Sequence, residues 1–273
     1  MRKKNWLAEL HWSVPWALLG IVAVLALEQF TSFDLALQDR LYDAASGGWL
    51  ADPNAALPRF LLYRLPKMLL WLTGLAALVL ALGPAAWRPR LARRDLWVFF
   101  TIMALVPLSV GAVKSVSRVN CPCELARYGG QVAYVKLFSA YAPEDRPARP
   151  GRCFPAAQAS GGFALMGLLA FGSSRGRFRR GFLIGSAAGF FLGFYQMARG
   201  AHFASHTLTS WLWAWLLALL IDHFWPREGG SAEPAAPPPP RRRRAGVVLK
   251  IGPSADFDPG HRGYRGAYWA GAR

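Results

Sequence analysis

Three side chains that could carry chemistry lie within eight residues of one another, between two apolar stretches of the chain. Arg199, His202 and His206 belong to the segment QMARGAHFASHT, residues 196–207. A histidine can attack an electrophile or transfer a proton near neutral pH. A spacing of four residues places His202 and His206 on one face of a helix that includes both. The segment therefore predicts a nucleophilic site, with His202 expected in an exposed cleft.

Two other interpretations fit the same pair of histidines. Both could be ordinary polar residues at the point where a helix enters a membrane. They could also be half of a zinc site completed by Cys121, Cys123 or Cys153, although this spacing fits no common zinc module.

The composition indicates a membrane protein, so membrane helices must position Arg199, His202 and His206. Hydrophobic residues make up 53% of the 273-residue chain and charged residues 17%, and the mean hydropathy is +0.20. A spanning helix needs about 20 mostly apolar residues, so we expect an all-α polytopic protein with six transmembrane helices. The six apolar runs are 13–31, 62–83, 96–113, 159–173, 181–198 and 207–225. The first run follows three basic residues and predicts an uncleaved signal anchor.

Basic residues between the runs predict which side of the membrane each loop faces, because Lys and Arg favour the cytoplasmic side. Arginines follow the second, fourth and sixth runs, at Arg88, Arg90, Arg93, Arg94, Arg175, Arg177, Arg179, Arg180, Arg227 and 241–244. Segments 32–61, 114–158 and 199–206 then face outward. The segment 114–158 nevertheless carries seven Lys and Arg residues, which indicates an anionic ligand on that side.

The formal net charge of +17 does not indicate nucleic acid as a partner, because the basic residues lie in loops and in the tail without interleaved aromatic residues. Residues 226–273 are rich in Pro, Gly and Arg and cannot bury a core. We therefore expect a membrane domain at 1–225 and a disordered basic cytoplasmic tail at 226–273.

Three polar clusters at the expected outer ends of the runs resemble, in order, the motifs of the type 2 phosphatidic acid phosphatase family. That family shares its core with bacterial acid phosphatases and vanadium haloperoxidases. Its pattern is Lys, six residues, Arg-Pro; then Pro-Ser-Gly-His; then Arg, five residues, His, three residues, Asp. The corresponding residues here are Lys114 with Cys121-Pro122, then Pro155-Ala156-Ala157-Gln158, then Gln196, His202 and His206. The segments CPCELARYGG, GRCFPAAQASGG and QMARGAHFASHTL are similar to the sequences of a bacterial, membrane-associated branch of the family.

The resemblance implies an integral-membrane lipid phosphatase that works through a phosphohistidine intermediate and needs no metal or other cofactor. His202 would be the nucleophile, and His206 would orient it. Lys114, Arg127 and Arg199 would bind phosphate oxygens. The small residues Ser160 and Gly161 would let free backbone N–H groups at the start of the fourth run approach the same anion. The substrate would be a lipid phosphate or diphosphate in the bilayer, and the resemblance places the protein in a bacterial inner membrane with its site facing the periplasm or exterior.

Gln158 stands where the family has its general-acid histidine, so we expect weak activity, or a lipid-phosphate-binding protein without turnover on the same fold. A small-solute transporter is a third class, suggested by six spans alone, but paired repeats are absent from the sequence. The three cysteines all lie in the segment expected outside. A disulfide between Cys121 and Cys153 would join the first two motifs, leaving Cys123 free; Cys123 is the alternative partner.

Overall fold

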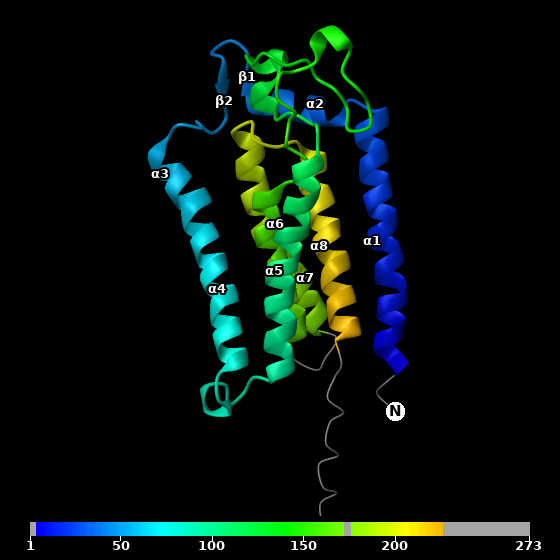
Figure 1. The fold of residues 1–273 in the computed structure, drawn as a ribbon, viewed down its shortest axis with the longest axis vertical. Coiled ribbons are helices and arrows are strands. Elements are labelled where there is room, and N and C mark those ends of the chain that lie inside the picture. The colour runs from blue at the N-terminus through cyan, green and yellow to red at the C-terminus, as the bar shows by residue number, and fades with distance from the viewer. Residues whose placement is uncertain (1–3, 172–175, 226–273) are drawn as a thin grey trace, which may run out of the picture. The chain divides into compact units, whose positions relative to one another are not determined.

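Helices dominate the computed structural model, which describes residues 4–171 and 176–225 (Figure 1). The long helices are α1 (Lys4–Phe30), α4 (Leu65–Leu82), α5 (Arg93–Val116), α7 (Gly176–Ala198) and α8 (Ala204–Phe224). A short helix α3 (Ala56–Arg59) and a π-helical turn η2 (Phe60–Arg64) run directly into α4. The chain is thus an all-α membrane protein, as expected.

Among the described residues, five helices are long and apolar enough to cross a bilayer, so the expected count of six is not confirmed. The exception is the fourth run, which forms the short helix α6 (Ala157–Phe163) followed by a 3₁₀ segment η7 (Ala164–Ala170). The tail expected at 226–273 lies outside the described residues.

Glycines on α7 explain how the short α6–η7 segment packs. Gly181, Gly185 and Gly189 recur every four residues and so line one face of α7. A Cβ on Gly181 would come within 2.6 Å of the Leu169 backbone, and one on Gly185 within 2.5 Å of Met166. Backbones approach this closely only where side chains are absent, as is common between membrane helices. The groove therefore holds α6–η7 against α7 inside the bundle.

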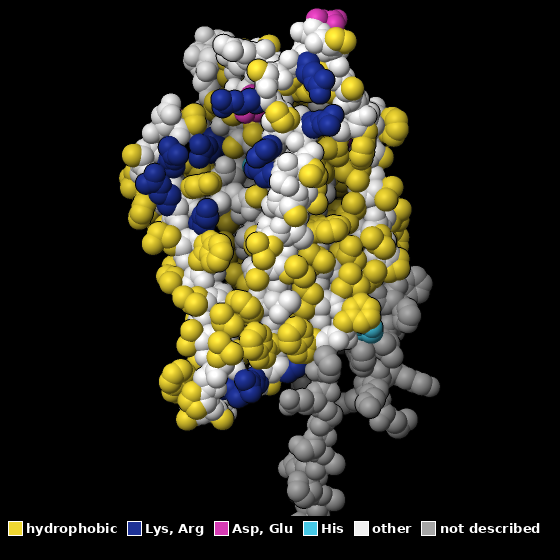
Figure 2. All heavy atoms as spheres, in the orientation of Figure 1, with side chains coloured by type: hydrophobic (Ala, Val, Ile, Leu, Met, Phe, Trp, Pro, Cys, Tyr) yellow, Lys and Arg dark blue, Asp and Glu magenta, His cyan; other side chains and the backbone are white. Residues whose placement is uncertain are grey.

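The remaining faces separate a packed interior from a lipid-facing exterior. Phe99 and Ile102 of α5 pack with Phe163 and Met166 in the main core. Large apolar side chains on α1 and α4 are exposed instead, and hydrophobic atoms cover the shaft of the bundle between basic residues at its two ends (Figure 2). A continuous exposed apolar surface of this kind fits a bilayer.

Loops and small elements gather at one end of the bundle, which we call the hairpin end (Figure 1). They are α2 (Phe33–Gln38), the 3₁₀ turn η1 (Asp39–Leu41), the antiparallel pair β1 (Tyr42–Asp43) and β2 (Gly48–Trp49), and the 3₁₀ turns η4 (Pro122–Glu124), η5 (Ala126–Tyr128) and η6 (Pro143–Asp145). The 3₁₀ turn η3 (Ala85–Trp87) joins α4 to α5 at the opposite end.

Helix α2 fixes the connection between α7 and α8 at the hairpin end. The carboxylate of Asp34 accepts a hydrogen bond from the backbone N–H of Ser205 at 2.9 Å and another from the Ser205 hydroxyl. The amide of Gln38 donates to the carbonyl of Met197 at 2.9 Å. Both side chains are buried, so α2 holds the segment 197–205 by hydrogen bonds at its two ends.

A buried ion cluster joins three helices near the opposite end. Arg94 of α5 and Arg177 of α7 contact the carboxylate of Asp222 of α8 at 2.8 and 2.9 Å. Arg177 also donates to the carbonyl of Leu169 at 2.8 Å. The sequence interpretation of Arg177 as a loop cation was wrong, because this residue is a buried part of α7.

Candidate active site

His202 lies in the tight connection between α7 and α8, and His206 lies in the first turn of α8. Gly200 makes the turn possible: its φ is +72°, and a Cβ there would overlap the Trp49 ring. The Nδ1 atoms of the two histidines are 3.5 Å apart. His202 is 5% exposed, so the expectation of an exposed cleft histidine was wrong. The loop packs against aromatic side chains of the hairpin end instead, with Gly200 against Trp49 and Phe203 beside Tyr128.

The second motif lies directly against the histidines. The Phe154 ring meets the His206 ring edge-on with centroids 5.3 Å apart, and the Ala156 N–H donates to the carbonyl of His206 at 3.3 Å. The Sγ of Cys153 is 3.5 Å from Nδ1 of His202. Residues 153–156 therefore set the ring orientations.

A disulfide joins Cys121 to Cys153, and Cys123 is a free, exposed thiol. The bridge ties η4, which follows α5, to the segment that leads into α6. The N–H of Cys123 donates to the carbonyl of Gly200 at 2.9 Å, so the first motif also contacts the histidine loop. All three motif regions thus meet at the hairpin end.

Electrostatics keep His202 neutral. Burial lowers its pKa well below the usual value, and the nearby His206 and Lys114 lower it further. A hydrogen bond to the Cys153 backbone opposes these effects but does not reverse them. A neutral imidazole has a lone pair on one nitrogen, which is the form that a nucleophile or a metal ligand requires. Among the described residues, Lys114 in the last turn of α5 is the only lysine whose charge lowers the pKa of His202.

Gln158 and Arg199 both contact Tyr63, a residue that was not predicted to belong to the site. The side-chain amide of Gln158 donates to the carbonyl of Tyr63 at 3.2 Å. The guanidinium of Arg199 lies 6.0 Å from the centroid of the Tyr63 ring and 5.9 Å from that of Tyr195. Tyr63 belongs to the π-helical turn η2, so this turn brings the start of α4 to the site.

Arg127 is engaged elsewhere at the hairpin end. Its guanidinium donates to both carboxylate oxygens of Asp39, at 2.9 and 2.7 Å, and the Tyr128 hydroxyl donates to the same carboxylate at 2.9 Å. These bonds lower the pKa of Asp39, the one from Arg127 most. Arg127 therefore binds an internal anion in this structure.

The small residues of α6 do not offer the expected free donors. The helix begins at Ala157, and the N–H of Ser160 already donates to the carbonyl of Ala156 at 3.1 Å. The Ser160 hydroxyl donates to the carbonyl of Ala157 at 2.7 Å. Gly161 faces Leu70, where a Cβ would lie 3.3 Å from the nearest methyl group. The proposal of an anion contact at the Ser160 N–H was thus wrong, because the helix starts earlier than the apolar run suggested.

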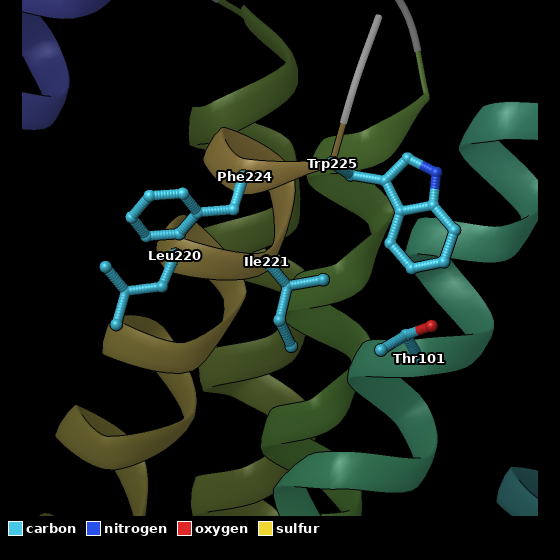
Figure 3. Close-up of a pocket in the computed structure, with 5 residues that line it drawn as sticks. All are labelled: Thr101, Leu220, Ile221, Phe224 and Trp225. Atoms are coloured by element: carbon cyan, nitrogen blue, oxygen red, sulfur yellow. The ribbon is translucent and has the colours of Figure 1, made fainter.

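An apolar groove lies far from these residues, near the opposite end of the bundle. Thr101 of α5 and four residues at the end of α8 line it, namely Leu220, Ile221, Phe224 and Trp225 (Figure 3). It offers almost no polar surface and no titratable side chain. We therefore assign the chemistry to the hairpin end.

Comparison with known protein families agrees with the geometry. Residues 95–229 match the family model of the PAP2 superfamily, and this range includes all three motifs. The chain belongs to the PAP2 superfamily. No curated protein and no solved structure matched it. Membership indicates a phosphatase, and the exposed apolar helices indicate that it acts in or on a membrane.

Proposed function

We propose that this PAP2 protein is an integral-membrane lipid phosphatase in which His202 attacks phosphorus. The observation that carries the proposal is the place of His202, buried in the connection between α7 and α8 with its Nδ1 3.5 Å from Nδ1 of His206; burial and the charge of Lys114 lower its pKa, which favours the neutral ring. Cys153 Sγ and His206 Nδ1 each lie 3.5 Å from Nδ1 of His202, so we assign the attack to Nε2. The Nε2–P bond forms as the bond from phosphorus to the leaving oxygen breaks, and water then cleaves the N–P bond to release phosphate.

The surrounding residues supply positioning and charge, which are the main needs of phosphoryl transfer. Lys114 binds phosphate oxygens as a point charge. Arg199 lies between two tyrosine rings without a carboxylate partner among the described residues, so its guanidinium is available for a bidentate contact. His206 orients His202 across their 3.5 Å contact. Arg127 joins this set only if the phosphate competes with Asp39.

Gln158 determines which substrates the site handles well. Its amide donates a hydrogen bond but delivers no proton near neutral pH. The departing oxygen of a phosphate monoester is strongly basic and needs that proton, whereas a diphosphate departs as a stable anion. We propose that the protein hydrolyses lipid diphosphates faster than lipid monophosphates.

The proposed location is a bacterial inner membrane with the hairpin end outside. Two observations support this orientation. Arg88, Arg90, Arg93 and Arg94 lie around the η3 turn at the opposite end, where the positive-inside rule places the cytoplasm. The disulfide lies at the hairpin end, and disulfides persist on the oxidising side of the membrane.

The test is phosphate release by the purified full chain in detergent. The panel contains phosphatidic acid, phosphatidylglycerol phosphate, a polyprenyl diphosphate and lipid A phosphates. Because His202 is buried, the matched control is His202→Asn, which keeps a polar side chain of similar shape, and its melting temperature is compared with that of the parent. We expect release by the parent and none by the variant. Tight binding of these lipids without any release would favour the alternative, a lipid-phosphate-binding protein.

A further inference from the structure

The disulfide sulfur beside the two histidines suggests a second state of the site. The ligand atoms of Cys153, His202 and His206 all lie within 4.8 Å of one another, and all three residues are buried. We propose that reduction of the Cys121–Cys153 disulfide creates a Cys-His-His site for a Zn²⁺-class ion, and that the ion blocks the attack by His202. This inference rests on the proposed role of His202.

The spacing of the three ligand atoms fits tetrahedral zinc. With Zn–S near 2.3 Å and Zn–N near 2.05 Å, the ideal S···N edge is about 3.5 Å and the N···N edge is about 3.3 Å. The distance from Cys153 Sγ to His202 Nδ1 is 3.5 Å, and the distance between the two Nδ1 atoms is also 3.5 Å. Two edges of the tetrahedron are therefore already formed, and a water or phosphate oxygen would take the fourth position.

The disulfide decides whether the ion binds. In the bridged form the sulfur carries no negative charge, and the nearby Lys114 repels a cation. A dithiol reductant supplies two electrons and two protons, which converts the bridge into the thiols of Cys121 and Cys153 while the dithiol becomes a disulfide. Metal binding then releases the thiol proton of Cys153 to solvent and leaves an anionic thiolate beside Lys114. The thiolate offsets the ammonium charge, which two neutral imidazoles cannot do.

Metal binding would disable the nucleophile through the tautomer of its ring. A neutral imidazole that coordinates zinc through Nδ1 carries its proton on Nε2. The lone pair of Nε2, which is assigned to attack phosphorus, is then no longer available. Zinc also replaces the contacts that Cys153 and His206 make with Nδ1. The reduced, metal-bound state is thus an inhibited state of the phosphatase.

Two variants test this proposal, because both lose the disulfide and only one keeps the ligand. Both are made in a Cys123→Ser background, which removes the remaining thiol. Cys121→Ser leaves the Cys153 thiol free, and Cys153→Ser removes it. Each full-length protein is purified without reductant, incubated with Zn²⁺ or Co²⁺, and passed over a desalting column.

We expect the Cys121→Ser protein to retain about one Zn²⁺ per chain and to show a thiolate-to-cobalt charge-transfer band with Co²⁺. The oxidised Cys123→Ser parent and the Cys153→Ser protein should show neither, and a dithiol should convert the parent to the metal-binding form. Zinc should lower phosphate release by Cys121→Ser at least about tenfold more than that by Cys153→Ser, and a chelator should reverse the loss.

Equal metal retention by Cys121→Ser and Cys153→Ser, or retention by neither, would overturn the proposal. Absence of phosphate release from the parent on every lipid would count against the proposed function alone. The metal content and the cobalt spectrum would still decide the metal site, because neither readout depends on turnover.

Discussion

Replacing Asp222 by asparagine should strongly destabilise the bundle. Its carboxylate contacts Arg94 at 2.8 Å and Arg177 at 2.9 Å, and the three side chains are only 10%, 3% and 5% exposed for Arg94, Arg177 and Asp222. Asp222→Asn keeps the shape but removes the charge, so the buried Arg177 guanidinium loses its carboxylate partner and Arg94 keeps only its 3.2 Å contact with Asp95. Breaking a buried pair in this way costs about 3–5 kcal/mol. For a domain of this size, each kcal/mol lowers the melting temperature by about 2–4 °C. The expected loss is therefore about 6–20 °C.

The assay is thermal unfolding in detergent, followed by tryptophan fluorescence. The matched control is Arg127→Ala, which also breaks an ion pair, but one whose partners are 52% and 39% exposed. An exposed pair contributes about 1 kcal/mol at most, so this variant should melt within about 4 °C of the parent. A triple variant with leucine at positions 94, 177 and 222 should recover part of the loss, because the three buried charges are removed together and only the partly exposed Asp95 loses a partner. A melting temperature for Asp222→Asn within about 2 °C of the parent would refute the reasoning.

Three further changes probe the site through phosphate release. Gln158→His should raise the rate on lipid monophosphates by up to about 10²–10⁴-fold and change the rate on diphosphates much less, since it restores a general acid; equal gains on both substrate classes would contradict this role. Lys114→Ala should raise KM and lower kcat, because a phosphate-binding charge is lost, whereas Lys114→Arg should retain more activity; an unchanged KM for Lys114→Ala would remove it from the site. Asp34→Ala should cost about 0.5–2 kcal/mol of stability, because the N–H of Ser205 in the first turn of α8 loses its acceptor, and should also lower kcat through the shifted histidine loop; a melting temperature and a kcat equal to those of the parent would show that this contact is dispensable.

The meeting of the three motifs was predictable from the sequence because each one stands at the end of an apolar run. Helices that cross a bilayer alternate direction, so their ends sort to two sides. Lys114 follows the third run, Cys153 precedes the fourth, and His202 precedes the sixth. The structure places all three residues at the hairpin end. The resemblance then indicated which of these residues would meet.

Partners from distant segments were not predictable, because no local pattern encodes them. Asp39 looked like an ordinary loop carboxylate, yet it binds Arg127, 88 residues away. Tyr63 looked like a residue of an apolar run, yet its carbonyl accepts a hydrogen bond from Gln158. The fourth apolar run was found at 159–173 but was counted as a spanning helix, because hydropathy reports only apolar content; the structure forms the short α6 and η7 there, packed against the glycines of α7.

The burial of His202 is a related failure of sequence reasoning. Arg199 and Gly200 come shortly before His202 and indicated an accessible turn, and histidine is of only intermediate burial in folded proteins. In the structure, Asp34 and Gln38 of α2 draw the loop 197–205 inward, and the hairpin end covers it. Burial is a property of the assembled end, and it is also the main cause of the low pKa of the ring.

The central claim is that phosphate passes through His202, and the most direct measurement is to trap the intermediate. The purified protein is mixed with a polyprenyl diphosphate, quenched in alkali, where phosphohistidine survives, and digested for mass spectrometry. The account predicts a phosphoryl group on His202 that disappears on brief acid treatment and is absent from His202→Asn. Rapid phosphate release with no phosphoryl group on His202, or with the group on another residue, would contradict it.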